Sequence, residues 1–197
     1  MANSDLEDIG LYYFKNILPA ELQTELLAWV CSKEIVEKFT PAFGNKSSTA
    51  GSGRVVCQFG YEYLYHQRDV GPSDQPIPEI LANSVIKLAN DLLEPRSEYF
   101  NQIIINKYKP GECITAHTDL YKFGEFICCF SLNYPATMKF KKVKAVDVEN
   151  APDTFEIVAG PGSVYLMSGP SRHKYTHEML KTRGARWSIT LRHVRST

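Results

Sequence analysis

Hydrophobic residues recur at helical spacing in the first half of the chain. Two segments, 19–30 and 78–93, carry apolar residues every three or four positions, and Pro19 opens the first of them. The apolar positions are Leu22, Leu26, Trp29 and Val30 in the first segment and Leu81, Val85, Leu88 and Leu92 in the second. Each segment is therefore predicted to be a helix with one buried side.

After residue 100 the pattern changes to short strands separated by glycine and proline. The predicted strands are 102–109, 113–119, 126–133, 136–142, 154–158, 163–168 and 186–194, preceded by the β-like segments 11–16 and 55–66. The Gly-, Ser- and Thr-rich segment 40–53 is predicted to be a loop. Helices followed by strands, rather than alternating with them, predict an α+β, mainly β fold: a jelly roll backed by two N-terminal helices.

The composition is typical of one globular domain. Hydrophobic residues make up 44% of the 197 residues, and no apolar run is long enough to span a membrane. We expect one domain over 1–197, in which 1–100 supply helical support and a substrate lid and 101–197 form the β core. Five cysteines without a CxxC pair, and an N-terminus without a basic and apolar leader, predict an intracellular protein with free thiols, in cytoplasm or nucleus. We expect a monomer.

The net charge is zero, but the two halves of the chain differ. Residues 1–100 contain 8 basic and 14 acidic residues, whereas residues 101–197 contain 14 basic and 8 acidic ones. Basic residues gather in KFKKVK (139–144) and in 172–195. A basic face on the second half would suit a polyanion, although solvated lysines on a hairpin explain 139–144 equally well.

A histidine and a carboxylate stand two residues apart in the HTD sequence at 117–119. Side chains at i and i+2 of a strand point to the same side, so His117 and Asp119 are expected to face one space if 113–119 is extended. The 2-His-1-carboxylate triad of non-haem Fe(II) oxygenases needs such a pair and a second histidine. HxD alone is a weak signal, because it occurs by chance in many chains.

Three downstream histidines are candidates for the second histidine ligand. His173 stands between Arg172 and Lys174, as expected for a turn in solvent, and His193 lies near the chain end. His177 follows at the point where the chain should return to extended structure. We therefore favour His177 over His173, and both over His193.

The last predicted strand carries polar residues on one face. Arg186, Ser188, Thr190 and Arg192 alternate there with Trp187, Ile189 and Leu191. The two arginines could bracket a small dicarboxylate, because a guanidinium pairs well with a carboxylate. An edge strand with its polar side in water explains the same pattern without any function.

Asn106 and Tyr108 also share one face, on the predicted strand that leads toward HTD. Their amide and phenol groups could complete a pocket for a cosubstrate. A strand tyrosine with its hydroxyl at the rim is an equally good interpretation of Tyr108.

Four motifs, in this order, resemble the AlkB family of Fe(II)/2-oxoglutarate dioxygenases. They are NKYKPG (106–111), HTD (117–119), SGPSRHKYTH (168–177) and RWSITLR (186–192). The final motifs are most similar to the AlkB-like domain of the tRNA wobble-uridine hydroxylase. The resemblance implies a double-stranded β-helix, which is the jelly roll of this family.

The resemblance also implies the residues of the site. His117, Asp119 and His177 would bind Fe(II), and Arg186 would pair with the distal carboxylate of the cosubstrate 2-oxoglutarate. The residues implied to line the same pocket are Asn106, Tyr108, Ser188 and Arg192. The reaction would release succinate and CO2 and hydroxylate a C–H bond. On an N-methyl group the product would collapse to formaldehyde and free base, as in demethylation and DNA or RNA repair.

The implied substrate is a modified base, N-methylated, in RNA or single-stranded DNA, held outside the stack. Tyr61, Tyr63 and Tyr65 could stack on it, although a buried aromatic strand is the commoner explanation. Tyr121 stands where repair members of the family carry an acidic residue against the base. That departure and the zero net charge favour an alternative, oxidation of a protein side chain. A non-catalytic β-sandwich that binds a partner through 139–144 is the third interpretation.

Overall fold

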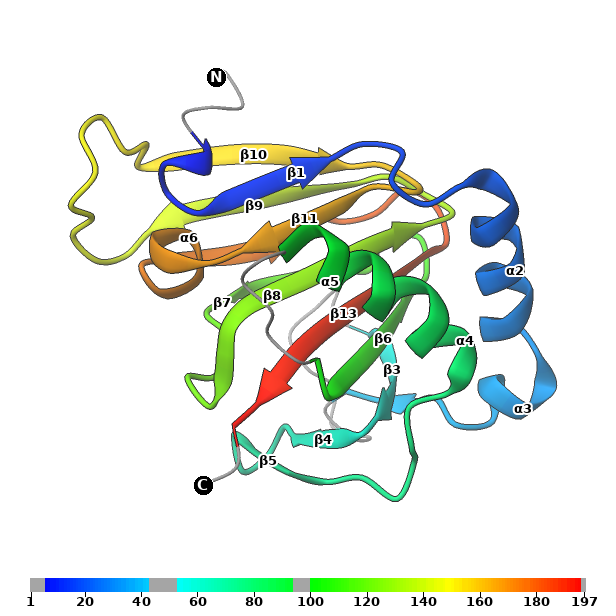
Figure 1. Ribbon diagram of the computed structural model, residues 1–197. Helices are drawn as coiled ribbons and strands as arrows, with labels where there is room; N and C mark the ends of the chain where they lie inside the picture. Colours follow the sequence, from blue (N-terminus) through cyan, green and yellow to red (C-terminus); the bar gives the residue numbers. More distant parts are fainter. Residues whose placement is uncertain (1–5, 43–52, 94–99, 196–197) are drawn as a thin grey trace.

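Two antiparallel sheets face each other in the computed structural model, which describes residues 6–42, 53–93 and 100–195 (Figure 1). The larger sheet has the order β1 (Leu11–Phe14), β11 (Val164–Met167), β8 (Phe123–Leu132), β13 (Arg186–Val194), β6 (Gln102–Tyr108), β3 (Val55–Phe59) and β2 (Thr40–Pro41). The smaller sheet has the order β10 (Thr154–Ala159), β9 (Ala136–Lys142), β12 (Tyr175–Met179) and β7 (Ile114–His117). A separate hairpin consists of β4 (Tyr61–Leu64) and β5 (Asp69–Pro72). The predicted mainly β jelly roll is confirmed.

Helices cover the outer face of the larger sheet (Figure 1). They are α2 (Ala20–Val30), α3 (Lys33–Val36), α4 (Glu79–Leu81), the π-helical turn η1 (Ala82–Ile86) and α5 (Lys87–Leu93), while α6 (Gly169–His173) connects β11 to β12. Both predicted helices are present, and the buried side of the second is wider than predicted. Beyond Val85, Ala89 and Leu93 are fully buried, whereas the predicted Leu88 and Leu92 are partly buried and pack against the same core. The π turn adds one residue to the helix and brings Ala89 and Leu93 to the centre of the buried side.

The larger sheet separates two hydrophobic cores. On β13, Trp187, Ile189 and Leu191 pack with the helices, whereas the alternate side chains face the space between the sheets. The interpretation of β13 as an edge strand is wrong, because β8 and β6 pair with it on either side. Its arginines Arg186 and Arg192 are consequently buried.

Two predicted strands end earlier than expected. The segment 55–66 divides at Gly60, whose φ of +78° and close approach to the main-chain oxygen of Asn101 leave no room for a Cβ. β7 ends at His117, so Asp119 lies in the following loop rather than on the strand. Most of the predicted loop 40–53, and with it part of the expected lid, lies outside the described residues.

No helix in the described ranges is long and apolar enough to cross a membrane. All five cysteines are free thiols, as predicted. Burial raises the pKa of the Cys57 thiol to about 11, so this group is a neutral core residue.

Candidate active site

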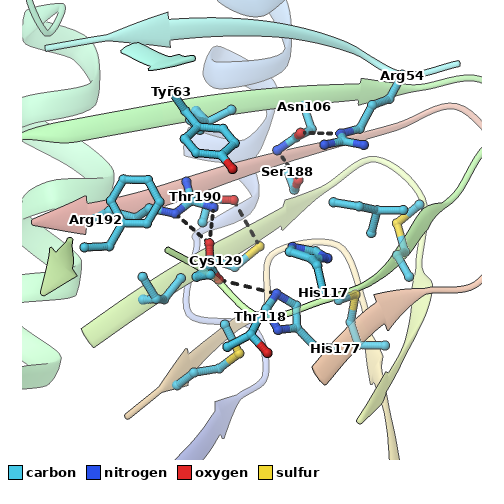
Figure 2. Close-up of a pocket in the computed structure, with 18 of the residues that line it drawn as sticks. Arg54, Tyr63, Asn106, His117, Thr118, Cys129, His177, Ser188, Thr190 and Arg192 are labelled. Carbon is cyan, nitrogen blue, oxygen red and sulfur yellow. Dashed lines mark hydrogen bonds and ion pairs between the residues drawn. The ribbon is translucent and has the colours of Figure 1, made fainter. Parts of the chain in front are cut away.

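A cavity of about 270 Å³ lies between the two sheets and extends to the β4–β5 hairpin (Figure 2). Residues from β6, β7, β8, β9, β11, β12 and β13 form most of its wall. Every polar residue predicted for iron and cosubstrate lies on this wall. The list is His117, Asp119, His177, Asn106, Tyr108, Arg186, Ser188 and Arg192. The jelly roll therefore brings together residues that are up to 86 positions apart, from Asn106 to Arg192.

His117, Asp119 and His177 form one cluster in this cavity. Their ligand atoms all lie within 4.8 Å of one another. His117 and His177 are directly opposite each other on the paired strands β7 and β12, and their ring centroids are 4.3 Å apart. The other two histidine candidates are not part of this cluster. His173 lies instead 3.2 Å from Glu125, with 43% of its side chain exposed.

Both clustered histidines are neutral at neutral pH. Burial lowers the pKa of His177 to about 3 and also lowers the pKa of His117, against the opposing effect of Asp119. The Nδ1 atom of His117 lies 2.8 Å from the main-chain oxygen of Thr115. Because a carbonyl oxygen only accepts hydrogen bonds, Nδ1 carries the proton and Nε2 keeps a lone pair for a metal.

Asp119 has one satisfied and one unsatisfied oxygen. Its Oδ1 accepts a hydrogen bond from Nε of Arg192 at 3.1 Å and forms an ion pair with Nη2 of the same guanidinium, also at 3.1 Å. Its buried Oδ2 has no hydrogen-bond partner, although it lies 3.4 Å from Nε2 of the neutral His177. Burial alone would raise the pKa of Asp119, but Arg192, the neighbouring imidazoles and Arg172 outweigh burial and hold the pKa well below the usual range.

This arrangement fits a divalent cation. A buried carboxylate oxygen without a donor is costly, and the cluster combines it with two neutral imidazoles. Two imidazoles and one carboxylate are the donor set of mononuclear non-haem Fe(II) sites. His117, Asp119 and His177, the three residues that the resemblance implied, could therefore hold Fe(II).

Arg186 is a buried cation on the cavity wall. It is 1% exposed, its Nη2 donates to Oγ of Ser131 at 2.9 Å, and its guanidinium lies 5.5 Å from the ring centre of Tyr108. Among the described residues no carboxylate pairs with Arg186, and its Nε has no hydrogen-bond partner. A buried guanidinium of this kind is stable beside an anion, and a carboxylate of 2-oxoglutarate fits that need.

The sequence did not reveal the residue that orients Asn106. Nε of Arg54, a residue 6% exposed, donates to Oδ1 of Asn106 at 3.0 Å. Nδ2 of Asn106 is thereby directed to Oγ of Ser188, at 3.5 Å (Figure 2). Arg54 follows a glycine- and serine-rich segment and carries no periodic signal, so only the fold places it here.

The predicted substrate tyrosines are not all brought to the cavity. Tyr63 lies on the wall, together with Tyr65, and their rings are 4.7 Å apart in an edge-to-face arrangement. Tyr61 and Tyr121 are not part of the wall, and Tyr121 is 78% exposed.

A jelly roll with a His-Asp-His cluster beside a buried arginine defines the class of 2-oxoglutarate-dependent Fe(II) oxygenases. The sequence model of the 2OG-Fe(II) oxygenase superfamily matches residues 10–193, and the chain belongs to this family. It is an oxidoreductase of the family that uses Fe(II) and 2-oxoglutarate.

Its relatives place it among the AlkB-like members. The tRNA (carboxymethyluridine(34)-5-O)-methyltransferase ALKBH8 of Mus musculus is 29% identical over 174 residues, which are 85% of this chain and 24% of that protein. The mitochondrial alkB homolog 7 dioxygenase of Mus musculus is 28% identical over 88 residues, 44% of this chain and 38% of that one. The chain thus spans about a quarter of the length of the ALKBH8 relative.

Solved structures agree on the fold. OsALKBH1 superimposes with a TM-score of 0.67 at 18% identity, covering 93% of this chain and 98% of that one. A Pseudomonas putida prolyl-4-hydroxylase gives a TM-score of 0.63 at 17% identity, covering 98% of this chain and 96% of that one.

Proposed function

We propose that this oxygenase binds Fe(II) through His117, Asp119 and His177 and oxidises a modified, N-methylated base in RNA or single-stranded DNA. The observation that carries the ligand assignment is the buried, unpartnered Oδ2 of Asp119 beside two neutral imidazoles. When bound, Fe(II) couples dioxygen to the oxidation of 2-oxoglutarate and of the substrate, and the products include succinate and CO2.

The remaining wall residues orient the reactants. Arg186 holds the distal carboxylate of 2-oxoglutarate, for which it has an unused Nε donor. Asn106, Tyr108 and Ser188 line the same part of the cavity and supply amide and hydroxyl groups. Arg192 holds Asp119 in its ionised form through a hydrogen bond from Nε and an ion pair with Nη2.

Aromatic and guanidinium groups near the hairpin support a base as the substrate. Tyr63 and Tyr65 line the cavity, and the guanidinium of Arg54 lies 5.8 Å from the ring centre of Tyr65. Tyrosine rings and arginine planes stack on unpaired bases. The relative ALKBH8 is named for an activity on tRNA, which supports the same class of substrate.

Succinate release tests this proposal. The protein with Fe(II) and 2-oxoglutarate is offered a panel of methylated and unmethylated DNA, RNA and tRNA, and at least one methylated oligonucleotide should stimulate release. The stimulation should disappear in His177→Ala and persist in His173→Ala, because His173 lies outside the cluster and contacts Glu125. If no oligonucleotide stimulates succinate release, the nucleic-acid substrate is wrong.

Oxidation of a protein side chain is the second candidate. The zero net charge and the exposed Tyr121, in place of an acid, favour it. Binding of oligonucleotides separates the two candidates, because phosphate contacts make affinity fall steeply with salt. Binding of single strands without salt dependence would favour the protein substrate.

A further inference from the structure

The wall of the cavity is strongly positive. Four arginines line it, and Asp119 is the only carboxylate among its described residues. The arginines are Arg54, Arg68, Arg186 and Arg192. Four positive charges against one negative charge leave the wall with a net charge of +3.

Bound iron and cosubstrate do not change this balance. The two positive charges of Fe(II) and the two negative charges of 2-oxoglutarate offset each other, and histidines bind metals in their neutral form. Three of the arginines are also at most 8% exposed, so solvent and salt screen their charge poorly. The substrate therefore enters a positive field.

The acidic residue next to Arg68 does not reverse that field. Asp69 follows Arg68 in sequence, but its Oδ1 is 2.7 Å from Nζ of Lys122, which offsets its charge. Tyr121, two residues after Asp119, contributes no charge and points its ring into solvent. Tyr63 and Tyr65 offer neutral ring faces at the same end of the cavity.

We propose, building on the nucleic-acid function above, that the base entering the cavity is neutral or anionic, and that cationic methylated bases are rejected by charge. Discrimination of this kind arises when like charges are brought together in a poorly solvated site. Bases such as 1-methyladenine and 3-methylcytosine, which are cations at neutral pH, belong to the rejected class. Neutral bases modified at the same positions belong to the accepted class.

Two RNAs that differ at one base test the proposal. One carries 3-methyluridine and the other 3-methylcytidine at the same position, so the methyl group is placed alike while only the second base is a cation. Fluorescence anisotropy with Fe(II) and 2-oxoglutarate, without oxygen, measures binding without turnover. The 3-methyluridine RNA should bind about tenfold more tightly. Equal affinity, or tighter binding of the 3-methylcytidine RNA, would overturn the proposal.

A charge reversal on the rim supplies the matched variant. Arg68 is exposed on the wall, so Arg68→Glu should narrow the affinity difference between the two RNAs. Arg183 is also exposed but not part of the wall, and Arg183→Glu should leave the affinity difference unchanged. If both variants reduced the affinity difference between the two RNAs by the same amount, the effect would not be local to the cavity, and the proposal would be contradicted.

Succinate release separates this proposal from the function on which it rests. If the 3-methylcytidine RNA is oxidised in preference to the 3-methyluridine RNA, the nucleic-acid function stands and the charge rule fails. If neither these RNAs nor the panel of oligonucleotides stimulates succinate release, the nucleic-acid function fails as well.

Discussion

Nη1 of Arg172 lies 3.0 Å from the main-chain oxygen of Asp119, in the loop that follows β7. The same guanidinium donates through Nη2 to the main-chain oxygens of Leu120 and Phe123, at 2.7 and 3.2 Å. Arg172 is 1% exposed, contrary to the solvent-exposed turn that the polar sequence around His173 predicted. The carboxylate of the cluster is thus held twice, by Arg172 through the main chain and by Arg192 through the side chain.

Arg172→Lys should loosen the loop that carries Asp119. A lysine ammonium cannot reproduce the planar fork that reaches three carbonyl oxygens, so some of them lose their donor. We expect a loss of about 3 kcal/mol in the free energy of unfolding and a metal Kd raised about tenfold. Urea unfolding and calorimetric metal titration measure the two effects. Lys174→Gln, two residues away, is the control and should change neither.

Metal should stabilise the protein against heat. At a free metal concentration of about 100 times the Kd, binding to the folded state alone contributes about 2.7 kcal/mol. Thermal unfolding with Fe(II) under nitrogen should therefore show a raised Tm that a chelator reverses. Asp119→Ala should abolish the shift, because it removes the only carboxylate of the cluster. A shift of the same size in Asp119→Ala would place the metal elsewhere.

Arg186→Met should weaken 2-oxoglutarate binding. The variant keeps a long apolar side chain at a buried position but removes the cation proposed to face the distal carboxylate. We expect the KM for 2-oxoglutarate to rise about a hundredfold, as for loss of one partner of a buried charge pair. Initial rates of succinate formation across 2-oxoglutarate concentrations provide the measurement. Arg183→Met, at an exposed position outside the cavity, should leave the KM unaltered.

Phe140→Ala should destabilise the core beneath the cluster. Phe140 is fully buried, stacks on Phe155 with ring centroids 4.8 Å apart, and lies 6.0 Å from the ring of His177. Truncation of a buried phenylalanine costs about 3–5 kcal/mol. Val158→Ala, on the neighbouring strand β10 and 59% exposed, should stay within about 0.5 kcal/mol of the parent protein. Chemical denaturation of both variants provides the comparison.

The metal-free protein should lose stability as the pH falls below about 6.5. The pKa of His177 is lowered from its ordinary value of 6.5 to about 3 in the folded state, so the unfolded chain takes up the proton first. The contribution of neutral His177 to the free energy of unfolding is complete above the pKa that His177 has in the unfolded chain. It is lost as the pH falls toward the pKa that His177 has in the folded protein. The loss amounts to at most about 5 kcal/mol. Unfolding measured from pH 7 to pH 4 should show this slope, and His177→Gln should reduce it.

Local spacing determined much of the fold class and of the candidate site. Alternation along 186–194 decided which residues share a face, and the same rule grouped Asn106 with Tyr108. These relationships depend only on the geometry of one strand, so they can be inferred before any strand partner is known. His117 and Asp119 come together for a different reason than expected, since Asp119 reaches the cluster from a loop.

Only the tertiary structure determined which residues each face of a strand contacts. An alternating strand can lie at an edge or in the middle of a sheet, and the pairing of β13 with both β8 and β6 is what buries Arg186 and Arg192. Arg54 and Arg172 look like ordinary polar residues in the sequence, because their partners are distant in the chain. Asn106 lies 52 positions from Arg54, and Asp119 lies 53 positions from Arg172. The net positive charge of the cavity wall likewise comes from arginines on strands and loops that are distant in the sequence. Periodicity is a property of neighbouring residues, whereas burial and electric field depend on contacts that the chain makes only when it folds.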